Sequence, residues 1–177
     1  MQNPYLLIID LQEKLYRAMN NKEEMLRKTI ILIKGFQLFE LPIIITEQVP
    51  EKLGPTIKPI KSLIPNIKPI HKSSFSCASN PEFISFVNNI ENIDGAVVAG
   101  IETHVCVYQT VKDLQKLGQK VEVVADAVTS RNLNDHDVAL ERIMQEGSFL
   151  TTAEMLLFSM QKNAKSTNFK ELVALVK

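Results

Sequence analysis

Residues 95–107 read GAVVAGIETHVCV, and this stretch decides the fold. The apolar run at 96–99, followed by Gly100, predicts a buried parallel strand. Helical spacing then continues as far as Leu117, which places Cys106 in the first turns of a helix. A helix N-terminus carries partial positive charge and free N–H groups, so it can stabilise a thiolate there. The alternative is a buried cysteine that only packs the helix against the sheet.

Strand and helix patterns alternate along the rest of the chain. Apolar runs predict strands at 5–9, 42–46, 67–71, 96–99, 121–125 and 149–150. Periodicity and capping patterns predict helices at 22–39, from Pro81, at 135–146, after a capping box at 151–154, and at 168–177. This alternation implies an α/β fold, with a parallel sheet covered by helices on both faces. The length of 177 residues suits a single domain over 1–177.

The composition is ordinary for a soluble domain, with 45% hydrophobic residues, 23% charged residues and zero net charge. We therefore expect no nucleic-acid partner, and because no apolar run reaches the roughly 20 residues of a membrane span, no membrane partner. The first strand begins without a basic leader segment, so no signal peptide is expected. Cys77 and Cys106 form neither a disulfide framework nor a C-x-x-C motif, which favours a reducing, cytoplasmic location.

One long stretch, 47–66, contains four prolines and one glycine and shows no strand or helix pattern. We predict a structureless loop there. Long loops in compact domains are often functional or lid-like. A plain surface excursion or an oligomer contact is the equally weighted alternative.

Three predicted strands are followed by residues able to do chemistry: Asp10, Lys72 and Cys106. The carboxyl ends of parallel strands share one edge of the sheet, so these groups can converge there. A carboxylate can take the thiol proton, and a lysine nearby lowers the pKa of the thiol. Each residue also has a plain structural alternative: Asp10 as a turn cap, Lys72 as a solvated lysine and Cys106 as packing.

The chain resembles the isochorismatase-like cysteine hydrolases nearly end to end. The matching blocks are LLIIDLQEKL (6–15), HKSSFS (71–76), VVAGIETHVCVYQTVKDL (97–114) and VVADAVTSRNLNDHDVALERI (123–143). The resemblance implies a three-layer α/β/α fold of Rossmann-like topology with a central six-stranded parallel sheet. It also implies a catalytic triad of Asp10, Lys72 and Cys106.

The resemblance further implies a cis peptide bond between Ile101 and Glu102, with the amides of Glu102 and Cys106 forming an oxyanion hole. We expect Glu102, Ile101, His104 and Phe75 around the oxyanion hole and the substrate, with His104 equally explicable as a hydrogen-bonded core histidine. We expect Asp126, Ser130 and Arg131 to be structural, with Asp126 bonded to backbone and Arg131 paired locally. Cys77 is expected to be incidental.

Nicotinamidases carry an Asp-x-His metal motif after the second strand, and this chain reads ITEQVP at 45–50 instead. Few metal ligands therefore remain, so we predict no metal, no cofactor and no nicotinamidase activity. The expected function is hydrolysis of a small amide or related acyl compound through a thioester, by a homo-oligomer. Two alternatives are a catalytically idle relative that binds a small molecule or protein partner, and a redox sensor using Cys77 and Cys106.

Overall fold

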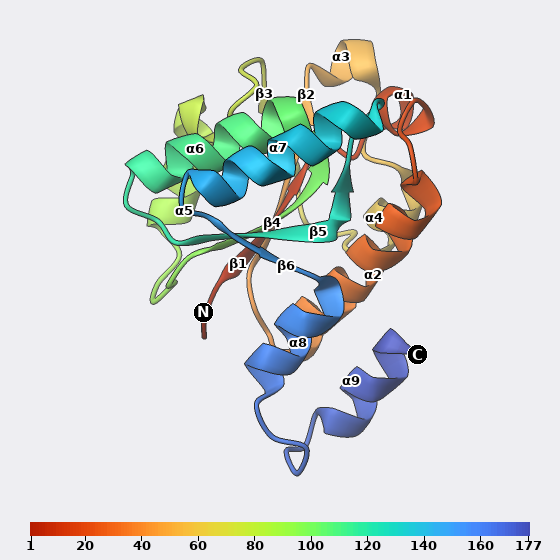
Figure 1. Ribbon diagram of the computed structural model, residues 1–177, viewed down its shortest axis with the longest axis vertical. Helices are drawn as coiled ribbons and strands as arrows, with labels where there is room; N and C mark the ends of the chain where they lie inside the picture. Colours follow the sequence, from red (N-terminus) through yellow and green to blue (C-terminus); the bar gives the residue numbers. More distant parts are fainter.

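The computed structural model describes residues 1–177 and contains one six-stranded, all-parallel sheet (Figure 1). The strand order is β3-β2-β1-β4-β5-β6. The strands are β1 (Tyr5–Ile9), β2 (Ile43–Gln48), β3 (Ile70–Lys72), β4 (Ala96–Ile101), β5 (Val121–Thr129) and β6 (Phe149–Thr151). The predicted parallel sheet is confirmed, and β3, which begins directly after Pro69, lies at its edge.

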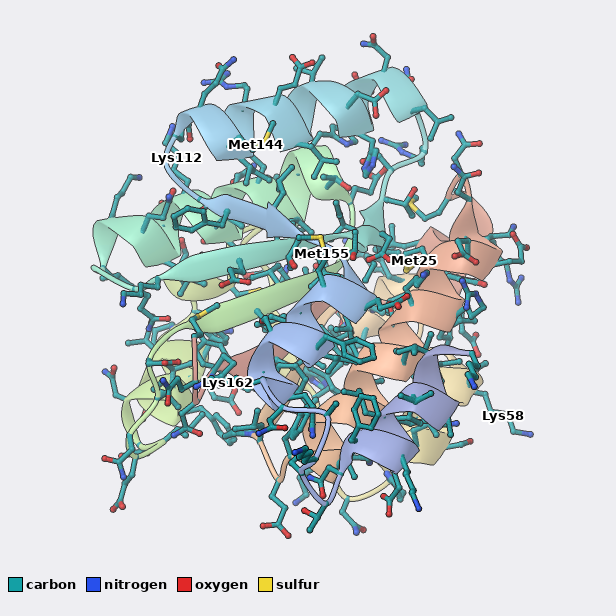
Figure 2. All side chains as sticks on the ribbon, turned by 60° about the horizontal axis from the view of Figure 1, so that its bottom comes forward. Met25, Lys58, Lys112, Met144, Met155 and Lys162 are labelled. Carbon is teal, nitrogen blue, oxygen red and sulfur yellow. The ribbon has the colours of Figure 1, made fainter.

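Helices cover both faces of the sheet, as predicted (Figure 1). One face is covered by α2 (Lys22–Leu38), α4 (Lys58–Leu63), α8 (Ala153–Gln161) and α9 (Phe169–Val176), and Figure 2 shows α8 and α9 against α2. The other face is covered by α5 (Pro81–Asn88), α6 (Tyr108–Lys116) and α7 (Leu133–Gln145). No helix is both long enough and apolar enough to cross a bilayer.

Strand β1 explains why the central strands read as unbroken apolar runs. Successive side chains of a strand point to opposite faces. Leu6 and Ile8 accordingly lie in the core under α2, and Leu7 and Ile9 lie in the core under α6. Because both faces are covered, no residue of β1 is exposed, and an alternating polar pattern is absent.

The prediction of a structureless loop at 47–66 is wrong. Strand β2 continues to Gln48, and two short helices follow, α3 (Pro50–Leu53) and α4. Both have proline in the first helical turn, where the missing N–H costs nothing. The buried residues Ile57, Ile60 and Ile64 anchor this segment in the core. Pro50 and Pro59 therefore mark helix starts here.

Strand β5 is also longer than predicted, because it runs through Asp126 to Thr129. Asp126 thus lies within the strand, where its Oδ1 accepts a hydrogen bond from the backbone of Ala153 at 2.8 Å. The predicted backbone bond of Asp126 is confirmed. The predicted cap of α8 is shifted by one residue, since the hydroxyl of Thr152 accepts from the Met155 amide.

The close approach of β4 to β1 depends on Gly100, which lies opposite Ile9 and has φ +119°. A Cβ atom at this position would lie 2.2 Å from the carbonyl oxygen of Ile9. Only glycine fits such a contact at positive φ. This contact sets the spacing of the strand ends next to Asp10.

Candidate active site

A buried ion pair joins the ends of two strands that are not neighbours. Lys72, the last residue of β3, places its Nζ 2.6 Å from Oδ2 of Asp10, directly after β1, and both side chains are fully buried. Burial lowers the pKa of Lys72, but the charge of Asp10, the nearby thiols of Cys77 and Cys106 and the hydrogen bond to Asp10 together outweigh burial, so the pKa lies above its usual value. Lys72 is therefore an ammonium.

Further polar groups complete the surroundings of this pair. Nζ of Lys72 also donates to Oε1 of Gln48 at 2.7 Å and to the carbonyls of Ser74 and Phe75 at 3.2 and 3.1 Å. The hydroxyl of Thr46 donates to Oδ1 of Asp10 at 2.8 Å. Each carboxylate oxygen thus has its own donor, which holds the carboxylate in one orientation.

Cys106 lies where the chain leaves β4, in a π-helical turn, Thr103–Val107, that leads into α6. The amide of Val107 donates to the carbonyl of Glu102, five residues earlier. Single π-helical turns within helices occur frequently at functional sites. The peptide bond between Ile101 and Glu102 is cis, as the resemblance implied.

The thiol of Cys106 is almost completely buried, with 6% of the residue exposed. Burial raises its pKa, the charge of Asp10 and a hydrogen bond to Asp10 raise it further, and Lys72 lowers it. The net shift is upward, so the prediction of a lowered pKa is wrong. The physical reason is that the ammonium of Lys72 is neutralised at short range by Asp10, which leaves burial as the largest effect.

The other predicted site residues lie around this centre. Ile101 is fully buried at the end of β4, and the Glu102 carboxylate accepts hydrogen bonds from the backbone and Nε of Arg131 at 3.1 and 3.0 Å. The predicted local pairing of Arg131 is therefore confirmed. Nδ1 of His104 lies 2.9 Å from the hydroxyl of Ser130. Phe75 is 53% exposed, and its backbone carbonyl contacts Lys72.

Cys77, which was expected to be incidental, lies in the surroundings of the ion pair. It is fully buried, and its Sγ lies 3.7 Å from the Thr46 hydroxyl that donates to Asp10. Burial, followed by the charge of Asp10, raises the pKa of Cys77 to about 11. Its backbone amide donates to the hydroxyl of Thr110 on α6. Cys77 therefore belongs to the polar network behind the ion pair.

Sequence reasoning did not assign roles to Thr46, Gln12 or Gln48. Thr46 and Gln48 are two apart in β2, so both side chains point to the face where Asp10 and Lys72 lie. The side-chain amide of Gln12 bonds to both backbone groups of Gln48, at 2.7 and 3.0 Å. The signal that could have found Gln12 is its place two residues after Asp10 in the block LLIIDLQEKL (6–15).

Glu47 and His71 are the nearby candidates for metal ligands, and other groups engage the Glu47 carboxylate. Oε1 of Glu47 accepts from the amide and hydroxyl of Thr56 at 2.7 Å, and Oε2 lies 3.3 Å from Nε2 of His71. Nowhere in residues 1–177 do three or more His, Cys, Asp or Glu side chains form a cluster suited to a metal ion.

The parallel sheet and the polar site at its carboxyl edge define an isochorismatase-like α/β protein. The chain belongs to the isochorismatase-like hydrolase family, because the isochorismatase domain model matches residues 4–155. Isochorismatase domain-containing protein 2 from Xenopus laevis is 36% identical over 171 residues, which cover 97% of this chain and 82% of that protein.

Solved structures share the fold. The MAR1 ribonuclease from Caenorhabditis elegans superposes with a TM-score of 0.92 at 32% identity, covering 99% of this chain and 90% of that one. The YcaC gene product from Escherichia coli, described as an octameric hydrolase of unknown specificity, superposes with a TM-score of 0.91 at 22% identity. It covers 98% of this chain and 86% of that one. At that identity the likeness concerns the fold alone.

Proposed function

We propose that this protein is a cysteine hydrolase of a small amide or related acyl compound, with a covalent thioester intermediate. Its catalytic residues are Asp10, Lys72 and Cys106. The observation that carries the proposal is the fully buried ion pair of Asp10 and Lys72 beside the thiol of Cys106. A buried charged pair costs desolvation energy and is weak evidence for stability alone, so a chemical role accounts for it better.

Acylation begins from a neutral thiol, because burial raises the pKa of Cys106. Asp10 takes the thiol proton as Sγ bonds to the carbonyl carbon, and the carbonyl π electrons move to oxygen. The backbone amides of Glu102 and Cys106 stabilise the oxyanion, as the family resemblance implies. The intermediate collapses by breaking the carbon–nitrogen bond, and the nitrogen leaves with the proton that Asp10 carried.

Deacylation reverses these roles. A water molecule attacks the thioester carbon and gives its proton to Asp10. The carbon–sulfur bond then breaks, the acid product leaves, and the proton on Asp10 returns to Cys106. Throughout, Lys72 contributes a fixed positive charge beside Asp10 and Cys106, and it needs no proton transfer of its own.

The substrate is expected to contact Ile101, Glu102, His104 and Phe75. Phe75 supports this assignment because its ring is largely exposed while its carbonyl contacts Lys72. The hydrogen bond between His104 and Ser130 fixes the orientation of the imidazole ring. This bond suits a histidine in the wall of the substrate pocket and equally a hydrogen-bonded core histidine.

The name of the ribonuclease from Caenorhabditis elegans raises RNA as a second substrate class. Zero net charge argues against it here, because RNA binding depends strongly on clustered Lys and Arg residues. The buried thiol also suits attack on a carbonyl carbon. An assay of RNA cleavage with wild type and Cys106→Ala decides between the classes, since RNA cleavage that needs Cys106 would contradict the amidase proposal.

We also propose that the protein is a homo-oligomer in the cytoplasm. Large apolar side chains are exposed at and near the outer strand β6: Phe149 at 70%, Met155 at 62% and Met144 at 51% (Figure 2 labels both methionines). The octameric state of the Escherichia coli protein is consistent with this proposal. Two unpaired cysteines suit a reducing compartment.

The deciding experiment traps the acyl-enzyme. The protein is mixed with p-nitrophenyl acetate, and both nitrophenolate release and the mass of the intact chain are followed. The expected result is an acetyl group on Cys106, absent in Cys106→Ala and retained in Cys77→Ala. Acetyl transfer that is unchanged in Cys106→Ala would contradict the proposal. A panel of small amides then tests turnover by ammonia or amine release.

A further inference from the structure

We propose that Gln48 is a positioning residue for Lys72: its neutral side-chain amide holds the ammonium beside Asp10 without adding a second negative charge to the site. This inference rests on the proposed function, since Lys72 is the charge that assists Cys106. It deepens that function by adding a residue that no comparison or motif had assigned.

The proposal starts from the three N–H protons of the Lys72 ammonium. Four acceptors surround Nζ: Oδ2 of Asp10 at 2.6 Å, Oε1 of Gln48 at 2.7 Å, and the carbonyls of Ser74 and Phe75 at 3.2 and 3.1 Å. The two short hydrogen bonds go to the side chains of Asp10 and Gln48, and the two carbonyls at longer distance share the third proton. No proton is left for a substrate, so Lys72 acts through its charge, and its position decides the effect.

Gln48 is itself held at every polar atom. Its Nε2 donates to the carbonyl of Ser73 at 2.8 Å. Rotating the side-chain amide by 180° would turn its NH₂ group toward the Lys72 ammonium and its oxygen toward the Ser73 carbonyl oxygen, so only the observed orientation is favourable. Its backbone amide donates to Gln12 Oε1 at 2.7 Å, and its carbonyl accepts from Gln12 Nε2 at 3.0 Å. The amide oxygen thus points at Lys72 from a rigid support.

The sheet brings these groups together. Gln48 lies directly opposite Lys72 in the register of β2 and β3, which puts the two side chains on one face. Gln12 follows Asp10 by two residues, so its bonds to Gln48 join the end of β1 to the end of β2. Both side chains are buried, Gln12 completely and Gln48 to 8% exposure. Gln48 therefore links the segment that carries Asp10, through Gln12, to the side chain of Lys72.

The neutral charge of Gln48 matters as much as its position. The charges of Asp10, Lys72 and Cys77 act on the pKa of the Cys106 thiol, and of these only Lys72 lowers it and so favours the thiolate. A carboxylate at position 48 would have nearly the same shape but would neutralise the remaining field of Lys72. The amide supplies an acceptor for the ammonium and leaves the site with one charge of each sign.

The test measures the rate of alkylation of Cys106 by iodoacetamide from pH 6 to 10 in ~0.5-unit steps, where the rate follows the small thiolate fraction of a thiol whose pKa is raised by burial. Peptide mass spectrometry reads each cysteine separately. Gln48→Glu adds the charge, and Gln48→Met removes the acceptor at similar length. Lys72→Met sets the scale for complete loss of the ammonium, and exposed Gln145→Glu controls for the added charge.

We expect Gln48→Glu to slow the alkylation of Cys106 roughly tenfold at pH 8 and by a similar factor across the pH range, because a nearby like charge disfavours the thiolate. Gln48→Met should fall between wild type and Lys72→Met, and Gln145→Glu should match wild type. A purely structural Gln48 would lower the melting temperature but leave the pH profile of the folded protein unchanged.

Wild-type profiles in folded Gln48→Glu and Gln48→Met would overturn the proposal, and so would failure of both variants to fold. If only one folds, its profile decides. Failure of the proposed hydrolase function is distinguishable, because wild type would then form no acetyl-enzyme while its alkylation still depended on Gln48 and Lys72.

Discussion

Asp10 and Lys72 are 62 residues apart in the sequence, yet their side chains meet at 2.6 Å in the fully buried interior. Strand β2 lies between the strands that carry them, and it supplies Thr46 to one partner and Gln48 to the other. The site is therefore assembled by three neighbouring strand ends on one side of Cys106. The charges of this site belong to the ion pair of Asp10 and Lys72, whereas the thiol of Cys106 is neutral.

Removing one partner of the pair should be severely destabilising. In Asp10→Leu the ammonium of Lys72 remains buried without its counter-ion, and we expect a loss of about 3–5 kcal/mol in the free energy of unfolding. Urea denaturation measures it. The double variant Asp10→Leu/Lys72→Met should recover much of this loss, because no unpaired charge remains. Additive losses in the double variant would contradict the buried-pair interpretation.

The two buried thiols should make the protein less stable in alkali. A thiol whose pKa is raised by folding stabilises the fold fully below its unfolded pKa, and this contribution is lost as pH rises. The unfolded value is about 8.5, and the pKa of Cys77 in the folded protein is raised to about 11. We therefore expect the unfolding free energy to decline from about pH 8.5 through pH 11.

The control for alkaline stability is Cys77→Ala, measured by urea denaturation at several pH values. Its decline between pH 8.5 and 11 should be shallower than that of wild type, because one titrating thiol is gone. Equal slopes for the two proteins would show that Cys77 does not carry this pH dependence. Cys106 shifts in the same direction, so part of the decline should persist in the variant.

Gly100→Ala should disrupt the junction of β1 and β4. The added Cβ would lie 2.2 Å from the backbone carbonyl oxygen of Ile9, at a φ of +119°. Backbone atoms in the middle of a sheet cannot move away cheaply, so we expect a loss of at least roughly 4 kcal/mol or an insoluble protein. Thermal unfolding of any soluble fraction measures this.

Gly118→Ala is the matched control, because its φ of +79° is also positive but an added Cβ would meet no atom within 4 Å. Only the conformational cost remains there, about 1 kcal/mol. A similar loss in the two variants would mean that the close approach of β4 to β1 is unimportant. A much larger loss for Gly100 would support it.

The proline-rich segment should contribute to the core. Ile60 on α4 is fully buried, and Ile60→Ala should cost about 2–5 kcal/mol through lost burial and the cavity left behind. Lys58→Ala is the control, because Lys58 extends into solvent from the same helix (Figure 2). Differential scanning calorimetry compares the two. An unchanged melting temperature for Ile60→Ala would restore the interpretation of this segment as a loose surface loop.

Local patterns predicted the fold well wherever one short-range signal dominated. The unbroken apolar runs of β1 and β4 predicted buried parallel strands, and Asn80 with Pro81 predicted the start of α5. The prediction failed at 47–66 because proline was taken as a breaker. The burial of Ile57, Ile60 and Ile64, which is a tertiary contact, overrides the weak local propensity there.

The sequence by itself determined the sheet edge and which residues follow its strands, because strand direction places every carboxyl end together. Only the tertiary structure decided the surroundings of Asp10, Lys72 and Cys106. Hydrogen bonds from Thr46 and to Gln48 join residues far apart in the chain, and no local pattern encodes them. The sign of the pKa shift of Cys106 likewise depends on burial and on how closely Asp10 neutralises Lys72, which are distances in space.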